Sequence, residues 1–135
     1  MAGDQDDLLA AARAAQAHAH APYSHFPVGA SVRTASGRIF AGSNVENVSF
    51  PEGICAEAAA IGAMVTAGER QIVEVLTIAD GGQVTTCCGG CRQRLAEFAS
   101  PDTPVHAAGP DGIRRSFTLG ELLPAAFGPE HLPDS

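Results

Sequence analysis

The pattern of apolar and polar positions divides the first third of the chain into one helix and two strands. A helix is predicted over Asp4–Ala21, because acidic residues occupy its first turn, Ala and Leu dominate its body, and Pro22 cannot continue it. Two β-like runs, Phe26–Thr34 and Arg38–Asn44, follow and flank a short turn that contains Gly37. This part of the chain therefore predicts a helix followed by a hairpin.

Helical and extended segments alternate through the rest of the chain. The predicted elements are a helix that starts near Cys55 and ends at Gly68, a buried strand over Gln71–Ala79, a helix from Cys88 that ends before Pro101, strands over Pro104–Ala108 and Ile113–Thr118, and a short helix over Leu119–Leu123. This order implies an α/β protein with a mixed five-stranded sheet covered by helices. We expect one domain over residues 1–135, since the length suits one core.

Three of the four cysteines fall into two short motifs, Cys55-Ala56-Glu57 and Cys88-Gly89-Gly90-Cys91, and Cys87 directly precedes the second. Each motif begins a predicted helix, and Cys88 and Cys91 share one helix face because they are three residues apart. Three sulfur ligands with one open position are typical of zinc that performs chemistry, and Glu57 places a proton carrier beside them. The positive ends of the two helices are also expected to lower the thiol pKa values.

Two other interpretations of the cysteines stay open. Free cysteines are among the most buried residue types, so the motifs are also compatible with ordinary core packing. A structural zinc site closed by four sulfurs would need Cys87 as the fourth ligand. Because Cys87 and Cys88 are adjacent, their side chains would have to point in opposite directions and still reach one tetrahedral ion, which favours three ligands.

Five motifs, in order along nearly the whole chain, resemble the small, homotetrameric, zinc-dependent cytidine deaminases. These motifs are Ala21–Ala30 (APYSHFPVGA), Asn44–Asn47 (NVEN), Cys55-Ala56-Glu57, Cys88–Gln93 (CGGCRQ) and Glu121–Phe127 (ELLPAAF). The resemblance implies a three-layer α/β/α fold. It also implies hydrolytic deamination of cytidine and 2′-deoxycytidine to uridine and 2′-deoxyuridine, with release of ammonia, for pyrimidine salvage.

The resemblance also implies roles for individual residues. Cys55, Cys88 and Cys91 would bind Zn²⁺, whose bound hydroxide attacks C4 of the pyrimidine while Glu57 carries protons. The expected substrate contacts are Asn44 and Glu46 on the ribose hydroxyls, Phe26 on the face of the base, the backbone of Ala56 and Cys88 at the amide edge of the base, and Phe127 from a neighbouring subunit.

The sequence departs from the family pattern at three positions. Cys87 stands where proline is usual, and we predict that it is reduced and is not a ligand. Ala58 stands where arginine is frequent, so another group must offset the negative charge of three thiolates around Zn²⁺. Arg92 is the nearest candidate by sequence. Phe50 replaces a frequent tyrosine, so any hydrogen bond of that hydroxyl is absent.

Charge and composition limit the classes of molecule that the protein is expected to bind. The net charge of −7 argues against polynucleotides, whose phosphates require a basic surface. No apolar run is long enough for a transmembrane span, and the acidic N-terminus lacks the features of a signal peptide, so we expect a cytoplasmic protein. Two alternative functions stay open: deamination of another amino-pyrimidine nucleoside, and a non-catalytic role with zinc as a stabiliser.

Overall fold

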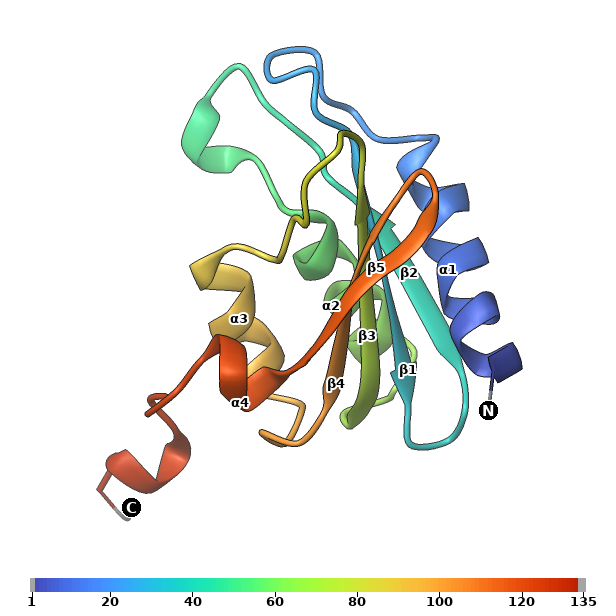
Figure 1. The fold of residues 1–135 in the computed structure, drawn as a ribbon. Coiled ribbons are helices and arrows are strands. Elements are labelled where there is room, and N and C mark those ends of the chain that lie inside the picture. The colour runs from blue at the N-terminus through green and yellow to red at the C-terminus, as the bar shows by residue number, and fades with distance from the viewer. Residues whose placement is uncertain (1, 134–135) are drawn as a thin grey trace.

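A computed structural model of the protein describes residues 2–133, in which five strands form one mixed sheet (Figure 1). The strands are β1 (Val28–Thr34), β2 (Ile39–Ser43), β3 (Ile72–Ala79), β4 (Pro104–Gly109) and β5 (Gly112–Thr118). Their order in the sheet is β2-β1-β3-β4-β5. The β3–β4 pair is parallel and the other neighbours are antiparallel. The predicted five-stranded sheet is therefore confirmed.

Helices cover both faces of the sheet and make the predicted three layers. They are α1 (Ala2–Gln16), α2 (Ala56–Thr66), α3 (Gly89–Ala96) and α4 (Leu119–Leu122), with 3₁₀ turns at Phe50–Glu52 and Pro129–His131. Figure 1 shows α1 on one side of the sheet and α2 with α3 on the other, while the segment after α4 extends away from the body of the chain. Both metal-motif helices thus lie on the same face.

Two predicted helices end earlier than expected, because tertiary pairing competes with helix formation. α1 stops at Gln16, and not before Pro22, because His20 pairs with Val45 as an isolated β-bridge. α3 stops at Ala96, because the following backbone accepts a hydrogen bond from the N–H of Ile72 and pairs beside β3. The predictions Asp4–Ala21 and Cys88 to Pro101 were therefore too long at their C-terminal ends.

The two faces of the sheet have separate apolar cores. Alternate residues of β3 point to opposite faces, so Leu76 and Ile78 pack with Leu8 and Ala12 of α1, whereas Val75 faces α2 and α3. The larger core, beneath α2 and α3, contains Val32, Ala60, Ile61, Met64, Ile72, Val75, Cys87, Cys91, Leu95, Val105, Leu119 and Leu122. Cys91 therefore joins the metal motif directly to this core.

Close approach between β2 and α2 sets the position of the first cysteine motif. A Cβ atom on Gly42 would lie 2.5 Å from the backbone nitrogen of Ala60 and 2.7 Å from the carbonyl oxygen of Ala56. Both contacts involve backbone of α2, which cannot give way as a side chain can. Only glycine therefore lets β2 approach α2 so closely, and this contact fixes where the helix that follows Cys55 lies.

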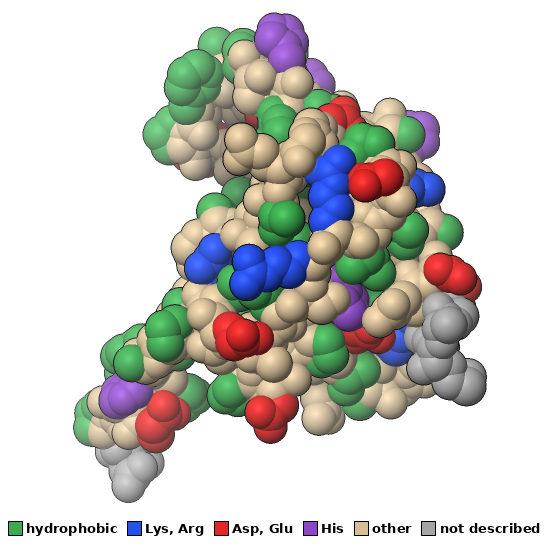
Figure 2. Space-filling view, in the orientation of Figure 1, with side chains coloured by type: hydrophobic (Ala, Val, Ile, Leu, Met, Phe, Trp, Pro, Cys, Tyr) green, Lys and Arg blue, Asp and Glu red, His purple; other side chains and the backbone are tan. Residues whose placement is uncertain are grey.

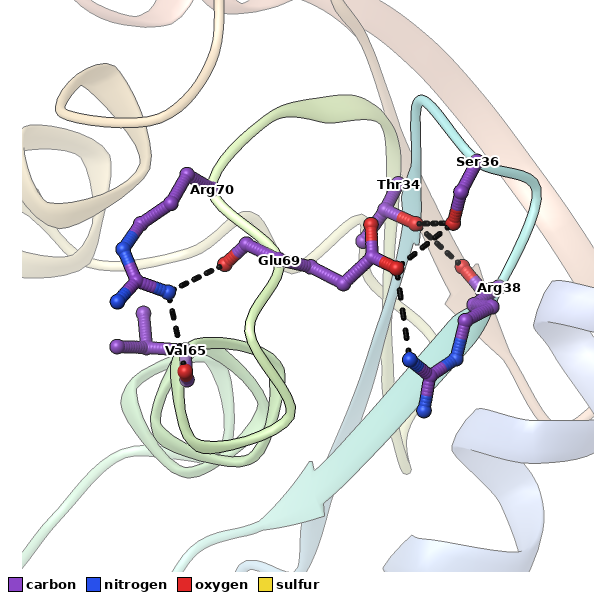
Figure 3. Close-up of polar contacts among 6 residues, drawn as sticks. All are labelled: Thr34, Ser36, Arg38, Val65, Glu69 and Arg70. Carbon is purple, nitrogen blue, oxygen red and sulfur yellow. Dashed lines mark hydrogen bonds and ion pairs between the residues drawn. The ribbon is translucent and has the colours of Figure 1, made fainter.

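The opposite end of α2 is tied to the β1–β2 hairpin by polar contacts (Figure 3). Glu69, after the helix, accepts hydrogen bonds from the Ser36 hydroxyl at 2.8 Å and from Arg38 at 3.5 Å, and the Ser36 hydroxyl also lies 3.0 Å from that of Thr34. Arg70 caps the helix by donating to the carbonyl oxygen of Val65 at 3.0 Å. Both ends of α2 are therefore held against the sheet.

Within residues 2–133, no helix combines the length and the apolar character that crossing a bilayer requires.

Candidate metal centre and active site

The two cysteine motifs meet where α2 and α3 begin. Cys55 is the N-cap residue of α2 and Cys88 is the N-cap residue of α3, both with extended backbone, and Cys91 lies in the first turn of α3. In this arrangement the free backbone N–H groups of two helix starts face one place, as the spacing predicted.

The sulfur atoms of Cys55, Cys88 and Cys91 form a compact cluster with all pairs within 4.8 Å. The Sγ atoms of Cys55 and Cys88 are 3.9 Å apart. A tetrahedral zinc ion with Zn–S distances of about 2.3 Å needs sulfurs about 3.8 Å apart. Three soft sulfur donors at this separation fit Zn²⁺, and they leave a fourth position open for water or substrate.

The thiol pKa values only partly follow the helix-dipole expectation. The backbone N–H of Cys91 lowers the pKa of the Cys88 thiol. Burial raises the pKa of the Cys55 and Cys91 thiols, and the nearby Glu57 carboxylate raises both further. The expectation that both helix starts lower thiol pKa values was therefore wrong for two of the three sulfurs. Such thiols keep their protons until a cation displaces them.

Cys87 lies beside the metal motif but outside the sulfur cluster. Among the described residues, the cluster consists of the other three cysteines. The Cys87 side chain is buried in the core beneath α3, and burial raises its pKa to about 11. The thiol is free of any disulfide. The sequence predicted that Cys87 is reduced and is not a ligand; the thiol is free, and its absence from the sulfur cluster supports the second part of this prediction.

Glu57 is held by a neighbour that the sequence analysis missed. Its side chain, in the first turn of α2, is 4% exposed, and Oε2 accepts a hydrogen bond from the Thr77 hydroxyl of β3 at 3.1 Å. Thr77 is 2% exposed. Threonine is ordinary in a buried strand, so nothing in the sequence singled it out; only the pairing of β3 beneath α2 reveals its role.

A cavity of about 170 Å³ opens over these groups. Its lining combines the predicted metal and catalytic residues with parts of β1, β3 and the segment before α3: Phe26, Val28, Cys55, Ala56, Glu57, Thr77, Thr85, Thr86, Cys87 and Cys88. The cavity is smaller than the roughly 300 Å³ of typical small-molecule sites, so it suits a single ring better than a whole nucleoside.

Asn44 and Glu46 clamp the loop that carries Phe26. Asn44 donates to the carbonyl oxygen of Phe26 at 3.0 Å and accepts from the N–H of Val28 at 2.9 Å. Glu46 accepts from the backbone N–H groups of Tyr23 and Ser24, at 3.0 and 3.1 Å, and from the Ser24 hydroxyl. The Ser24 hydroxyl and N–H lower the pKa of the Glu46 carboxyl.

A second cavity, of about 350 Å³, adjoins the same two segments of chain. It is lined by Tyr23, Ser24, Glu46, Asn47, Phe50 and Gly53. Because Ser24 precedes Phe26 and Gly53 precedes Cys55 by two residues, the loops that border this cavity also border the cavity over the sulfurs. Glu46 therefore faces a space next to the metal motif, as a substrate contact would.

Phe127 lies outside the catalytic cavity of the described chain. It is 59% exposed on the C-terminal segment, stacks on His131 with ring centroids 5.5 Å apart, and accepts a hydrogen bond at its carbonyl oxygen from Gln93. Its expected contact with substrate belongs to a neighbouring subunit and stays a prediction.

Arg94, and not Arg92, contacts the sulfur cluster. Arg92 donates to the carbonyl oxygens of Cys87 and Leu122, at 2.9 and 2.8 Å, and to the Thr86 hydroxyl at 2.8 Å, so its guanidinium anchors the loop before α3. Arg94 donates to Cys91 Sγ at 3.6 Å. The suggestion that Arg92 serves the thiolates was therefore wrong. The i, i+3 spacing from Cys91 to Arg94 was the signal that identifies the right residue.

Comparison with known proteins agrees with this site. The sequence model of the cytidine and deoxycytidylate deaminase zinc-binding region matches residues 3–107. The cytidine deaminase of Halalkalibacterium halodurans is 36% identical over 97% of this chain and 99% of its own length. The crystal structure of cytidine deaminase from Burkholderia pseudomallei is 37% identical, covers 90% of this chain and 98% of that one, and superposes with a TM-score of 0.85.

A second solved structure, cytidine deaminase from Mycobacterium tuberculosis, is 37% identical with a TM-score of 0.79, and the match covers 91% of this chain and 96% of that one. The matches span nearly the full length of both partners, so they include both cysteine motifs and the sheet that joins them. This chain therefore belongs to the cytidine deaminase family of zinc-dependent enzymes.

Proposed function

We propose that this protein hydrolyses cytidine and 2′-deoxycytidine to uridine and 2′-deoxyuridine, with release of ammonia, as a step of pyrimidine salvage. The observation that carries the proposal is the sulfur cluster of Cys55, Cys88 and Cys91, of which Cys55 and Cys88 line the same cavity as the buried Glu57. A structural zinc site is closed by four protein ligands, so it needs neither a carboxylate nor a cavity beside the metal ion.

Cys55, Cys88 and Cys91 hold the metal ion. Bound Zn²⁺ supplies a Lewis acid that makes water nucleophilic at neutral pH. The three sulfurs come from two helix starts that are anchored in the core, and Cys55 and Cys88 line the cavity, so an ion held by these residues would be accessible from the cavity.

Glu57 carries the protons of the reaction. Its Oε2 is held by Thr77, which fixes the carboxylate and leaves Oε1 for the cavity. From there Glu57 takes the proton of the attacking water, delivers it to the ring nitrogen next to C4, and then protonates the departing amino group. Burial keeps bulk water away from this exchange.

Phe26, Ala56, Asn44 and Glu46 bind the substrate. Phe26 and Ala56 line the cavity, where the aromatic ring covers one face of the base and the backbone of Ala56 meets its amide edge. The sugar extends from the small cavity toward the larger one beside it, where Glu46 accepts hydrogen bonds from the ribose hydroxyls and Asn44 supports the same contact.

We also propose a homotetramer with active sites near the subunit interfaces. Large apolar side chains are exposed on the loops around the cavities, among them Val48 at 79% and Phe50 at 73%. Figure 2 shows hydrophobic side chains on the projecting loops at the top of that view. A second copy would cover this surface, and Phe127 on the extended C-terminal segment would enter a neighbour's site.

We propose that the enzyme lies in the cytoplasm, where thiols stay reduced, because oxidised cysteines could not serve as metal ligands. Cytidine and deoxycytidine are the proposed partners, and neither polynucleotides nor membranes are expected. The net charge of −7 opposes binding to the negatively charged phosphates of polynucleotides.

Loss of the near-ultraviolet absorbance of cytidine on mixing with the purified, zinc-loaded protein tests the activity. Ammonia release in equal amount identifies the reaction as deamination, and the Glu57→Gln variant is the matched control. We expect turnover of both nucleosides by wild type and turnover at least about 10²-fold slower by the control. Stoichiometric zinc without any loss of absorbance would overturn the proposed activity and leave the two alternatives, a deaminase of another amino-pyrimidine nucleoside and a non-catalytic zinc-stabilised protein.

A further inference from the structure

With Zn²⁺ bound, the three thiolate ligands would carry more negative charge than the metal ion neutralises. Three thiolates around a divalent cation leave one net negative charge, and the Glu57 carboxylate next to them adds another. The Cys91 side chain has no solvent-exposed surface, so water does not screen charge on its sulfur, and such buried charge is costly. A cation near the sulfurs would offset this cost. The sequence contains no lysine, so arginine must supply it.

The side chain of Arg94 reaches back along α3 to the sulfur cluster. Nη1 lies 3.6 Å from Cys91 Sγ, and a Cβ atom placed on Gly90 would be 3.3 Å from the same nitrogen. The guanidinium therefore lies over the first turn of α3, although the residue belongs to the last turn. The absence of a side chain at Gly90 leaves room for it there.

This location is unfavourable for a cation unless an anion holds it. The first turn of a helix is the positive end of its dipole, which repels a guanidinium. Among the described residues, the structure gives Arg94 the Cys91 sulfur as its hydrogen-bond partner and no carboxylate. A thiolate ligand is the anion that makes the position favourable.

We propose that Arg94 is a positioning residue of the metal centre. Its guanidinium donates a charge-assisted hydrogen bond to the Cys91 thiolate, offsets the charge of the three-sulfur ligand set and slows the loss of Zn²⁺. The proposal rests on the zinc site of the proposed function but not on its substrate. It identifies Arg94, on α3, as the residue that supplies the positive charge that is absent at Ala58 of α2.

Zinc affinity measured without substrate tests this role. The full chain, loaded with zinc, competes with a chromophoric chelator at fixed pH and salt, and the zinc affinity and release rate are compared for wild type, Arg94→Gln and Arg94→Lys. The matched control is Arg70→Gln, which removes an exposed arginine whose hydrogen bonds go to backbone carbonyls at the end of α2.

We expect Arg94→Gln to lose about 10- to 100-fold in zinc affinity, the usual effect of removing a partner of a metal ligand. Arg94→Lys should recover part of this loss, because it keeps the charge, and Arg70→Gln should match wild type. Equal affinity of Arg94→Gln and wild type would overturn the proposal, as would an equal loss in Arg94→Gln and Arg94→Lys. Failure of the proposed function shows separately, as a wild-type protein that binds zinc and leaves cytidine unchanged.

Discussion

Replacing Thr77 by valine removes one hydrogen bond from Glu57 and changes little else in shape. The bond is 3.1 Å long, and both residues are less than 5% exposed. A hydrogen bond to a charged group contributes about 1.5–3 kcal/mol. At 1.36 kcal/mol for each factor of ten, this energy corresponds to a fall in kcat of about 10- to 150-fold if Glu57 needs the bond during proton transfer.

Steady-state kinetics with cytidine, together with zinc content, distinguish this effect from damage to the site. Thr77→Val should keep one zinc per chain and a nearly unchanged KM, because Thr77 bonds the carboxylate and not the sulfurs. Thr77→Ser restores the hydroxyl and should return kcat most of the way to wild type. If Thr77→Val turns over cytidine within twofold of wild type, or if Thr77→Ser is equally slow, the hydroxyl does not position Glu57.

Three further changes test other parts of the site. Glu57→Gln should keep its zinc and lose at least about 10²-fold in kcat, since proton transfer by a placed side chain is worth about 10²–10⁴-fold; retained zinc with near-normal turnover would remove Glu57 from the mechanism. Cys87→Ser should bind one zinc per chain like wild type, and a missing equivalent in metal analysis would make Cys87 a ligand. Gly42→Ala should lower the free energy of unfolding by about 1–3 kcal/mol, because its Cβ meets the backbone of α2; an unchanged denaturant midpoint would contradict this close approach.

The helix starts at the two cysteine motifs were predictable from the sequence, and the ends of α1 and α3 were not. Cys55 and Cys88 begin their helices because the preceding turn residues and the following helix formers act locally. The ends of α1 and α3 depend instead on partners far away in the sequence: His20 pairs with Val45, and the chain after α3 pairs with Ile72. No local signal in either helix contains that information.

The same distinction separates the predicted from the unpredicted parts of the site. The three sulfurs could be found from spacing, because each motif is local and zinc needs only that the two motifs meet. Thr77 could not, since it becomes a partner of Glu57 only when β3 lies beneath α2. Arg94 is an intermediate case. Its three-residue spacing from Cys91 can be read from the sequence, but Arg92 is closer to the motif and was therefore favoured. All three donor nitrogens of Arg92 bind oxygen atoms outside the sulfur cluster.

Asn44 and Glu46 hold a loop and still keep hydrogen-bonding positions for the proposed contact with the sugar. A carboxylate offers about four acceptor positions, and the Tyr23–Ser24 backbone with the Ser24 hydroxyl uses three of those of Glu46. One position is then left for a ribose hydroxyl. Asn44 likewise uses one acceptor and one donor on the loop and keeps one of each. Because that loop also carries Phe26, the proposed contact with the sugar and the proposed cover over the base both depend on Asn44 and Glu46. A change in either residue should therefore alter both recognition events together.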